Sequence, residues 1–246
     1  MIMKKIAAII LAAGKGVRMQ SDLPKVFHKL LGKPLLQHVL GTVQKLGIEK
    51  VCVVVGHKKE LIADYFKDWP VTFVHQTEQL GTGHAVKVVE PYLKDFDGEV
   101  LVLAGDVPLL SKETLQELID FHISRDASAT DLTAQLPDAG SYGRIIRDNY
   151  GKIVKIVEKK DATPEQLQIK EINTGTFCFN SKDLFAALSE VKPLNAQKEY
   201  YLTDTIEILR QKGKNVFAFM AKNYKETLGI NTKEELAEMG KSLLQL

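Results

Sequence analysis

Two glycines and three cationic side chains cluster in one short stretch near the start of the chain. The run Leu11-Ala12-Ala13-Gly14-Lys15-Gly16-Val17-Arg18-Met19 is followed at once by Asp22-Leu23-Pro24-Lys25. Glycine backbone can adopt positive φ and lets N–H groups approach an anion without a Cβ in the way. Arg18 can grip phosphate oxygens with two parallel hydrogen bonds, and Lys15 and Lys25 add point charges. The stretch therefore predicts a loop that binds the phosphates of a nucleotide.

Two better-known phosphate-binding motifs do not fit this loop. The dinucleotide fingerprint G-x-G-x-x-G needs a third glycine where Met19 stands, and the Walker motif needs Gly-Lys-Ser/Thr at the end of the loop. A plainer interpretation stays open on these residues alone, namely that Gly14 and Gly16 only form a tight turn between a strand and a helix.

Alternating apolar runs position the loop. Residues 5–11 are almost wholly apolar and β-branched, which predicts a central parallel strand covered on both faces. Similar runs predict buried strands at 51–55, 71–75 and 100–104, with helical stretches between them, the clearest at 34–46. This alternation indicates an α/β fold: a Rossmann-like, predominantly parallel twisted sheet with helices on both faces.

Ligands of such sheets gather at the carboxyl ends of the strands. Gly14, Gln76 and Asp106 each follow a predicted strand, so we expect them to face one crevice. Asp106 in this position could be a ligand of Mg²⁺, which prefers oxygen donors, or it could cap a turn.

The second half of the chain has a different texture. Residues 142–148 and 152–157 predict a hairpin around the turn 148–151, and hence a small β-containing lobe. We expect helices at 182–188 and 201–211 and a strand at 215–220. Thr232 and Glu235 have capping-box spacing and predict a closing helix that extends to about Leu244.

Composition excludes several classes of function. The 246 residues include 33 basic and 31 acidic ones, a net charge of +2, so we expect no nucleic-acid partner and no membrane partner. No window approaches the roughly 20 apolar residues of a membrane span, and residues 6–13 lack the features of a signal peptide, so we expect a cytoplasmic location. Cys52 and Cys178 lie in apolar strand-like runs and are interpreted as core residues, with no disulfide framework or metal quartet.

Seven further blocks follow the loop in a fixed order and extend over nearly the whole chain. They are Gln76 with Glu78-Gln79-Leu80-Gly81-Thr82-Gly83-His84-Ala85, Gly105-Asp106-Val107-Pro108-Leu109, Tyr142-Gly143-Arg144-Ile145, Val157-Glu158-Lys159-Lys160-Asp161-Ala162-Thr163, Glu171-Ile172-Asn173-Thr174-Gly175, Glu199-Tyr200-Tyr201-Leu202-Thr203-Asp204, and Gly229-Ile230-Asn231. With the first loop, this series resembles the sugar nucleotidyltransferases, and among them the uridyltransferase domain of the bacterial N-acetylglucosamine-1-phosphate uridyltransferases.

The resemblance implies the nucleotide-diphospho-sugar transferase fold with a sugar-binding lobe, over residues 1–231. Residues 232–246 would be a C-terminal helix, after which the resembled bifunctional enzymes carry a β-helix acetyltransferase domain. In those enzymes the β-helix domain builds the trimer and carries out acetyl transfer. Because the sequence of this chain does not include such a domain, we expect a monomer without acetyl transfer.

The implied activity is a magnesium-dependent enzyme reaction. UTP and N-acetylglucosamine 1-phosphate would give UDP-N-acetylglucosamine, a peptidoglycan precursor for cell wall biogenesis, and pyrophosphate, by in-line attack of the sugar phosphate on the α-phosphorus. The implied catalytic residues are Arg18, Lys25 and Asp106. The nucleotide would contact Leu11, Ala13, Gly14, Lys25, Gln76, Gly81 and Thr82. The sugar would contact Gly105, Gly143, Glu158, Asn173 and Thr203, and Mg²⁺ would bind Asp106 and Asn231.

Several of these residues also have plainer interpretations. Asn231 could cap the closing helix, and Glu158 could belong to an exposed strand linked by salt bridges to Lys155, Lys159 and Lys160. Gln76 would be a solvated loop residue but for Gly81-Thr82-Gly83, whose backbone can close over a ligand, while His84 is interpreted as a structural hydrogen-bonding group.

Two alternative functions stay open. The resembled family commonly has an aromatic residue before Gly-Asp, where this chain has Ala104, so the substrate could be another hexose 1-phosphate or another nucleoside triphosphate. The chain could also be a non-catalytic sensor of sugar nucleotides. The presence of Lys25, Asp106 and Asn231 disfavours a sensor, because binding alone does not require groups that act on the transition state.

Overall fold

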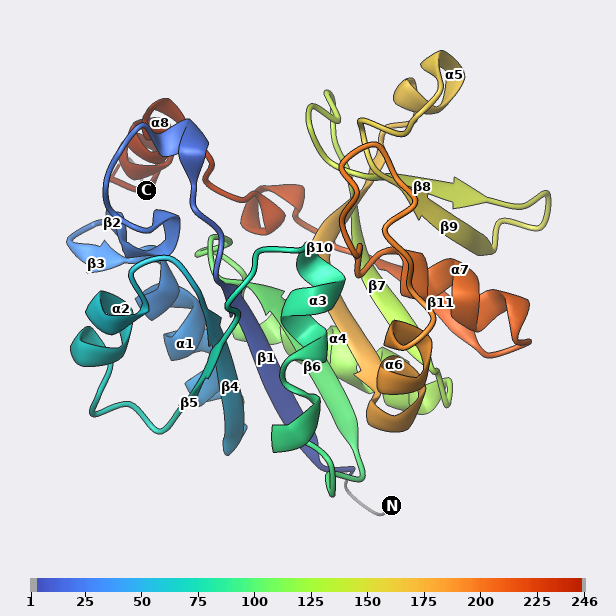
Figure 1. The fold of residues 1–246 in the computed structure, drawn as a ribbon. Helices are drawn as coiled ribbons and strands as arrows, with labels where there is room; N and C mark the ends of the chain where they lie inside the picture. The colour runs from blue at the N-terminus through green and yellow to red at the C-terminus, as the bar shows by residue number, and fades with distance from the viewer. Residues whose placement is uncertain (1–3, 245–246) are drawn as a thin grey trace.

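A mixed sheet separates two layers of helices in residues 4–244, the part of the chain that the computed structural model describes (Figure 1). The strands are β1 (Ile6–Ala12), β2 (Lys29–Leu30), β3 (Lys33–Pro34), β4 (Lys50–Val55), β5 (Thr72–His75), β6 (Glu99–Ala104), β7 (Ala129–Gln135), β8 (Arg144–Arg147), β9 (Ile153–Val157), β10 (Glu171–Asn180) and β11 (Val216–Met220). The helices are α1 (Leu35–Lys45), α2 (Lys59–Tyr65), α3 (Thr82–Lys87), α4 (Lys112–Ser124), α5 (Pro164–Leu167), α6 (Ser181–Leu188), α7 (Asp204–Gln211) and α8 (Lys233–Leu244).

The main sheet has the order β11-β7-β10-β6-β1-β4-β5. β1 pairs in parallel with β4 and β6, β4 with β5, and β7 with β11. These strands include the four predicted from apolar runs, so the predicted α/β class and the predominantly parallel sheet are confirmed. Burial explains the pattern, since β1 and β6 are almost wholly buried and are covered on both faces.

Two apolar clusters, one on each face of the sheet, form the core. Residues of α3, α6 and α7 pack on one face, and residues of α1, α2 and α4 pack on the other. Figure 1 shows α3 and α6 in front of the strands and α4 behind them. Cys52 and Cys178 are buried and unpaired, one in each cluster, which confirms their interpretation as core residues.

Strand β10, whose bounds the sequence did not indicate, connects the second half of the chain to the central strands of the sheet. It runs antiparallel to both neighbours, β6 and β7. Its first residues therefore lie at the carboxyl ends of those strands, at the same edge as the loop after β1. A bulge interrupts the pairing with β7 between Asn173 and Thr176, where Gly175 has φ +79°. Such bulges redirect side chains at the rim of a sheet.

The predicted hairpin and closing helix are present. β8 and β9 pair antiparallel and join the main sheet where Arg144 pairs with Ile172 of β10. Thr232 caps α8 by accepting the N–H of Glu235 at 3.1 Å. In the expected capping box, the Glu235 carboxylate would accept the N–H of Thr232. It accepts the N–H of Asn231 instead, at 2.6 Å. No helix in residues 4–244 is long and apolar enough to cross a membrane.

Asp131 in β7 has a buried carboxyl group, and neither of its oxygens has a hydrogen-bond partner among the described residues. Burial raises its pKa well above the ordinary value of 3.8, and the nearby carboxylates of Glu171 and Glu158 raise it further. The folded chain therefore keeps a proton that the unfolded chain releases. A raised pKa of an acid means that stability is lost as pH rises from the unfolded-state pKa toward the folded-state pKa.

We expect Asp131→Asn to remove the loss of stability that the ionisation of Asp131 causes as pH rises. Relative to the unchanged protein, the variant should gain stability as pH rises above about 4, by up to about 1.4 kcal/mol per pH unit until the folded-state pKa is reached. Urea unfolding at pH 4.5 and at pH 7.5 measures the two differences. An Asp131→Asn effect of equal size at both pH values would contradict a protonated Asp131 in the folded chain.

Candidate active site

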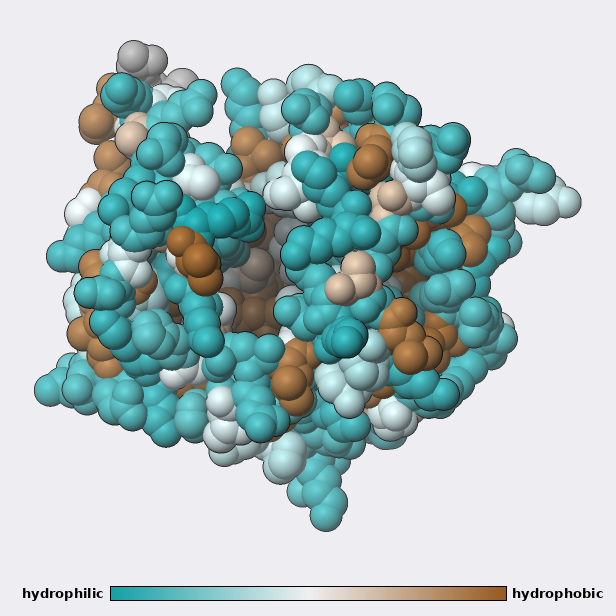
Figure 2. All heavy atoms as spheres, turned by 45° about the horizontal axis from the view of Figure 1, so that its top comes forward, coloured by the Kyte–Doolittle hydropathy of each residue, from teal (hydrophilic) through white to brown (hydrophobic). Residues whose placement is uncertain are grey.

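The predicted site residues gather where the strands of the sheet end. Figure 2 shows the molecule hollowed at this edge, between the side that carries the N-terminal loop and α8 and the side that carries the β8–β9 hairpin. Gly14 follows β1, Gln76 follows β5, and Gly105 and Asp106 follow β6. The expectation that these loops face one crevice agrees with this arrangement.

The two glycines of the first loop have different roles. Gly16 has φ +62°, and a Cβ built on it would lie 2.5 Å from Lys25 Cβ. Gly14 is exposed, does not have positive φ, and has no atom within 4 Å of such a Cβ. Of the two glycines, only Gly16 therefore uses a φ value that other residues rarely adopt. Met19, at the place of the third glycine of a dinucleotide motif, is fully buried and anchors the loop.

Four polar residues from distant parts of the chain meet beside this loop. Lys25 Nζ forms an ion pair with Asp106 and donates to Asn231 Oδ1 at 2.6 Å. Arg18 Nη2 donates to the same oxygen of Asn231 at 2.8 Å. Lys25 and Asp106 are both largely shielded, with side chains 16% and 19% exposed, so little solvent screens their attraction. The cluster thus places two cations and one carboxylate at the edge of the crevice.

The oxygens of Asp106 and Asn231 converge on one cation, the Lys25 ammonium. A carboxylate and an amide oxygen suit a hard divalent cation that takes the rest of its shell from water and substrate. No group of three His, Cys, Asp or Glu side chains in residues 4–244 could hold a metal ion. A cation held by Asp106 and Asn231 would therefore complete its shell with water or with oxygens from substrate.

The residues predicted for the nucleotide lie around the end of β1. The Gly105 N–H donates to Leu11 O at 2.9 Å, and a Cβ on Gly56, just after β4, would lie 2.9 Å from Ala13 O. Gln76 is only 3% exposed, and its amide nitrogen donates to Gly81 O at 3.2 Å and to His84 Nδ1 at 3.0 Å. Because an amide NH₂ can only donate, His84 Nδ1 accepts. The interpretation of His84 as a structural hydrogen-bonding group agrees with this contact.

The segment Gly81-Thr82-Gly83 is held in place, contrary to the expectation of a backbone free to close over a ligand. Gly83 N donates to Tyr200 O at 2.7 Å, and Leu202 N donates to Thr82 Oγ1 at 3.0 Å. A Cβ on Gly81 would lie 2.6 Å from Tyr200 O. These glycines allow close packing against residues 199–202 and the start of α3, so they serve contact rather than flexibility.

Four of the five residues predicted for the sugar lie together on the other side of the crevice, whereas Gly105 lies beside Leu11. Thr203 Oγ1 donates to Glu158 Oε1 at 3.2 Å, Asn173 N donates to Gly143 O at 3.0 Å, and a Cβ on Gly143 would lie 3.3 Å from Glu158 Oε2. Within residues 4–244 no ion pair involves Glu158. The alternative of a strand linked through Glu158 to neighbouring lysines is therefore wrong.

Carboxyl groups crowd this side of the site. Burial raises the pKa of Glu158, and the charges of Asp161 and Asp204 raise it further, against the hydrogen bond from Thr203. Burial also raises the pKa of Asp204 to about 6, with added repulsion from Glu207 and Asp161. The sugar side thus offers hydrogen-bond acceptors with weakened charge, which suits neutral hydroxyl and amide groups.

Ala104 lies close to the bulge of β10. It ends β6, and its Cβ lies 3.9 Å from the Cβ that would be built on Gly175 in the bulge of β10. The bulge also positions Asn173, whose Oδ1 accepts the Gly175 N–H at 2.7 Å.

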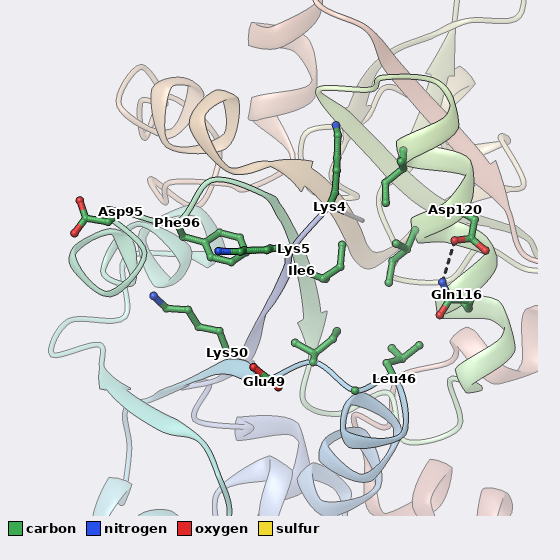
Figure 3. Close-up of a pocket in the computed structure, with 14 residues that line it drawn as sticks. Lys4, Lys5, Ile6, Leu46, Glu49, Lys50, Asp95, Phe96, Gln116 and Asp120 are labelled. Atoms are coloured by element: carbon green, nitrogen blue, oxygen red, sulfur yellow. Dashed lines mark hydrogen bonds between the residues drawn. The ribbon is translucent and has the colours of Figure 1, made fainter. Parts of the chain in front are cut away.

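A separate cavity lies at the opposite end of the strands. It has a volume of about 910 Å³ and lies where β1 and β4 begin. Its lining combines aliphatic side chains with Phe96, three lysines, the carboxylates of Glu49, Asp95 and Asp120, and Gln116. Figure 3 shows Lys50 and Phe96 on the same side of this cavity, and Lys50 Nζ lies 5.8 Å from the centroid of the Phe96 ring. None of the predicted site residues lines this cavity.

Tyr142 and Arg144 hold segments next to the predicted site residues, although the sequence indicated them only as part of a motif block. The Arg144 guanidinium is buried and donates to the carbonyls of Ala139, Gly140 and Tyr142, which shapes the turn before Gly143. Tyr142 Oη accepts the Gly229 N–H at 2.9 Å. Only the spacing of the block Tyr142-Gly143-Arg144 could have indicated these contacts.

Comparisons with known proteins point to one family. The family described as "Nucleotidyl transferase" matches residues 7–230. "Bifunctional protein GlmU" of Streptococcus gordonii is 51% identical over 230 residues, which are 94% of this chain and 50% of that protein. The protein of the same name from a Geobacillus species is 49% identical over 239 residues, 97% of this chain and 52% of that protein. The chain spans about half the length of these relatives.

Solved structures share the fold at low identity. A UDP-glucose pyrophosphorylase complexed with UDP-glucose superposes with a TM-score of 0.81 at 20% identity, covering 99% of each chain. HddC from Yersinia pseudotuberculosis complexed with GMP-PN gives a TM-score of 0.72 at 22% identity, covering 98% of this chain and 100% of the other. These likenesses confirm the predicted nucleotide-diphospho-sugar transferase fold.

The two loop glycines provide a matched test of the loop. We expect Gly16→Ala to lower the free energy of unfolding by about 1–2 kcal/mol or more, because a left-handed residue with a Cβ is strained and this Cβ also collides with Lys25. Gly14→Ala should leave stability within about 0.5 kcal/mol, as for other unconstrained surface positions. Urea denaturation of both variants decides this. Equal losses in the two would show that Gly16 is not under the strain described.

Proposed function

Because the chain belongs to the nucleotidyl transferase family, we propose that it is an enzyme that makes UDP-N-acetylglucosamine and pyrophosphate from UTP and N-acetylglucosamine 1-phosphate. The relatives named above that are about half identical are bifunctional GlmU proteins, and this chain aligns with about half of their length. The proposal concerns nucleotidyl transfer only.

The convergence of Lys25, Asp106 and Asn231 beside the Gly-rich loop is the observation that carries the proposal. These residues come from three separate motif blocks, and Lys25 contacts both of the others. A protein that only binds sugar nucleotides does not need a shielded cation and two aligned oxygens at the end of a phosphate loop. A transferase needs them, because negative charge accumulates where two phosphate groups react.

The reaction requires one bond to form and one to break. An oxygen of the sugar phosphate attacks the α-phosphorus of UTP, and the bond from that phosphorus to the oxygen bridging to the β-phosphate breaks in line, releasing pyrophosphate. The attacking phosphate is already ionised, so no general base is required. The protein supplies position and charge: Lys25 and Arg18 oppose the charge on the triphosphate, while the loop backbone at Gly14 holds it.

Asp106 and Asn231 would hold a Mg²⁺ ion, and their fit is supported by the ammonium that both oxygens contact. When bound, Mg²⁺ draws charge from phosphate oxygens and orients them. The Lys25 ammonium contacts both Asp106 and Asn231. It would move away from these two oxygens when the ion binds and would stay near the phosphates.

The remaining predicted residues divide between the two substrates. Leu11, Ala13, Gln76, Gly81 and Thr82 would form the uridine side. Both nitrogen-bound hydrogens of Gln76 have partners within the protein, which leaves its Oε1 to accept the uracil N–H. On the sugar side, Gly105, Gly143, Glu158, Asn173 and Thr203 would offer acceptors to hydroxyl groups and polar groups to the acetamido substituent.

A second candidate differs only in substrate. The alanine at position 104 favours it, because a site wall with alanine in place of an aromatic side chain could accept another hexose 1-phosphate. The expected monomer, the cytoplasmic location and the boundary near residue 231 stay predictions.

The first test is pyrophosphate release by the purified protein with Mg²⁺ and UTP. We expect rapid release with N-acetylglucosamine 1-phosphate, slower release with glucose 1-phosphate or other nucleoside triphosphates, and none with EDTA. Release only with another pair would establish the second candidate, and tight binding of UDP-sugar without any turnover would indicate a sensor.

Asp106→Ala tests the charged cluster directly. We expect turnover to fall by at least about a hundredfold, the scale on which loss of one stabilising group slows catalysis, with circular dichroism and unfolding midpoint close to those of the unchanged protein. Asp22→Ala, an exposed carboxylate near the same loop, is the matched control and should retain activity. Full activity of Asp106→Ala would remove Asp106 from the reaction.

A further inference from the structure

Three consecutive backbone N–H groups hold the segment Gly229-Ile230-Asn231, and each bonds to a different part of the fold. Gly229 N donates to Tyr142 Oη at 2.9 Å, Ile230 N to Asp106 O at 3.0 Å, and Asn231 N to Glu235 Oε2 at 2.6 Å. The segment thus connects the turn before β8, the end of β6 and the first turn of α8. Two of its three acceptors are side chains.

These bonds set the direction of the Asn231 side chain. With its N–H bound to Glu235, Asn231 turns its amide toward the charged cluster, where Oδ1 accepts from Lys25 and Arg18. Its amide nitrogen donates to Gly229 O at 3.3 Å, which closes the segment on itself. The position of Asn231 Oδ1 relative to Asp106 therefore depends on groups that touch neither oxygen.

Packing alone does not fix the segment. Ile230 is buried in a small apolar cluster with Leu30 and Leu35. On the other side, Gly229 and Asn231 line a cavity of about 510 Å³ together with Tyr142 and Glu235. Hydrogen bonds that the backbone donates to these two side chains consequently hold the face of the segment that packing leaves open.

We propose that Glu235 and Tyr142 are positioning residues that hold Asn231 in register with Asp106 for binding a divalent cation. Neither side chain is assigned to substrate or metal. Glu235 acts through the Asn231 backbone, and Tyr142 acts through Gly229, so the C-terminal helix and the β8–β9 lobe both control the same pair of oxygens. This inference rests on the proposed function, because it concerns the same site.

Titration of the full chain with Mn²⁺, with free Mn²⁺ counted by electron paramagnetic resonance, tests the proposal without relying on turnover. We expect Glu235→Ala to raise the Kd for Mn²⁺ by about tenfold or more, the usual effect of losing a group that orients a metal ligand. Tyr142→Phe should act in the same direction, because phenylalanine has no oxygen to accept the Gly229 N–H. In steady state, both variants should need more Mg²⁺, with the KM for the sugar phosphate unchanged.

Three further variants separate positioning from helix stability. Glu235→Gln should restore Mn²⁺ binding, because its side-chain carbonyl can accept the same N–H. Glu234→Ala, an exposed neighbour in the same helical turn, should bind Mn²⁺ as the unchanged protein does. Thr232→Ala removes the cap of α8 but not the bond from Asn231 to Glu235, so it should lower the unfolding midpoint more than it weakens Mn²⁺ binding.

The outcomes distinguish this inference from the proposed function. Unchanged Mn²⁺ binding in Glu235→Ala and Tyr142→Phe, or a Thr232→Ala effect as large as that of Glu235→Ala, overturns the positioning role while leaving the proposed function standing. An unchanged protein that neither binds Mn²⁺ nor releases pyrophosphate overturns the proposed function, and the inference with it.

Discussion

The electrostatic contact among Lys25, Asp106 and Asn231 is the interaction on which the site depends. It joins the loop after β1, which carries Lys25, to the end of β6 and to the segment before α8. Asp106 and Asn231 lie 81 and 206 positions after Lys25 in the sequence. Partial burial strengthens the attraction, because little solvent screens it. The same loop needs a glycine at position 16, since a Cβ there would occupy the space of Lys25. The position of the Lys25 charge therefore depends on the left-handed backbone conformation of Gly16.

The antiparallel strand β10 completes the site from the other side. A purely parallel sheet places the starts of its strands away from the ligand edge, but β10 reverses direction between β6 and β7. Its first residues can therefore meet Gly143 and the β8–β9 hairpin at the crevice. The bulge at Gly175 then directs Asn173 inward. The residues predicted for the phosphates and most of those predicted for the sugar thus come from two halves of the chain that share one sheet.

Polar contacts to the backbone hold several turns of the second half in addition to its apolar packing. Tyr142 and Glu235 bind the backbone of residues 229–231, and Arg144 binds the carbonyls of residues 139–142. Hydrogen bonds fix direction as well as distance, which a site for charged substrates requires. Asp131 shows the opposite situation, because its buried carboxyl has no partner among the described residues and weakens the folded state when ionised.

Strands β1, β4, β5 and β6, the hairpin and the closing helix could be predicted from the sequence, because apolar periodicity and turn residues act locally. The position of Gly14, Gln76 and Asp106 at one edge could be predicted too, since parallel strands end together. The reversal of β10, the tight packing of Gly81 against Tyr200 and the partner of Glu235 became visible only in the folded chain. These features depend on contacts between residues far apart in the chain or on the choice between adjacent N–H groups, which no local pattern encodes.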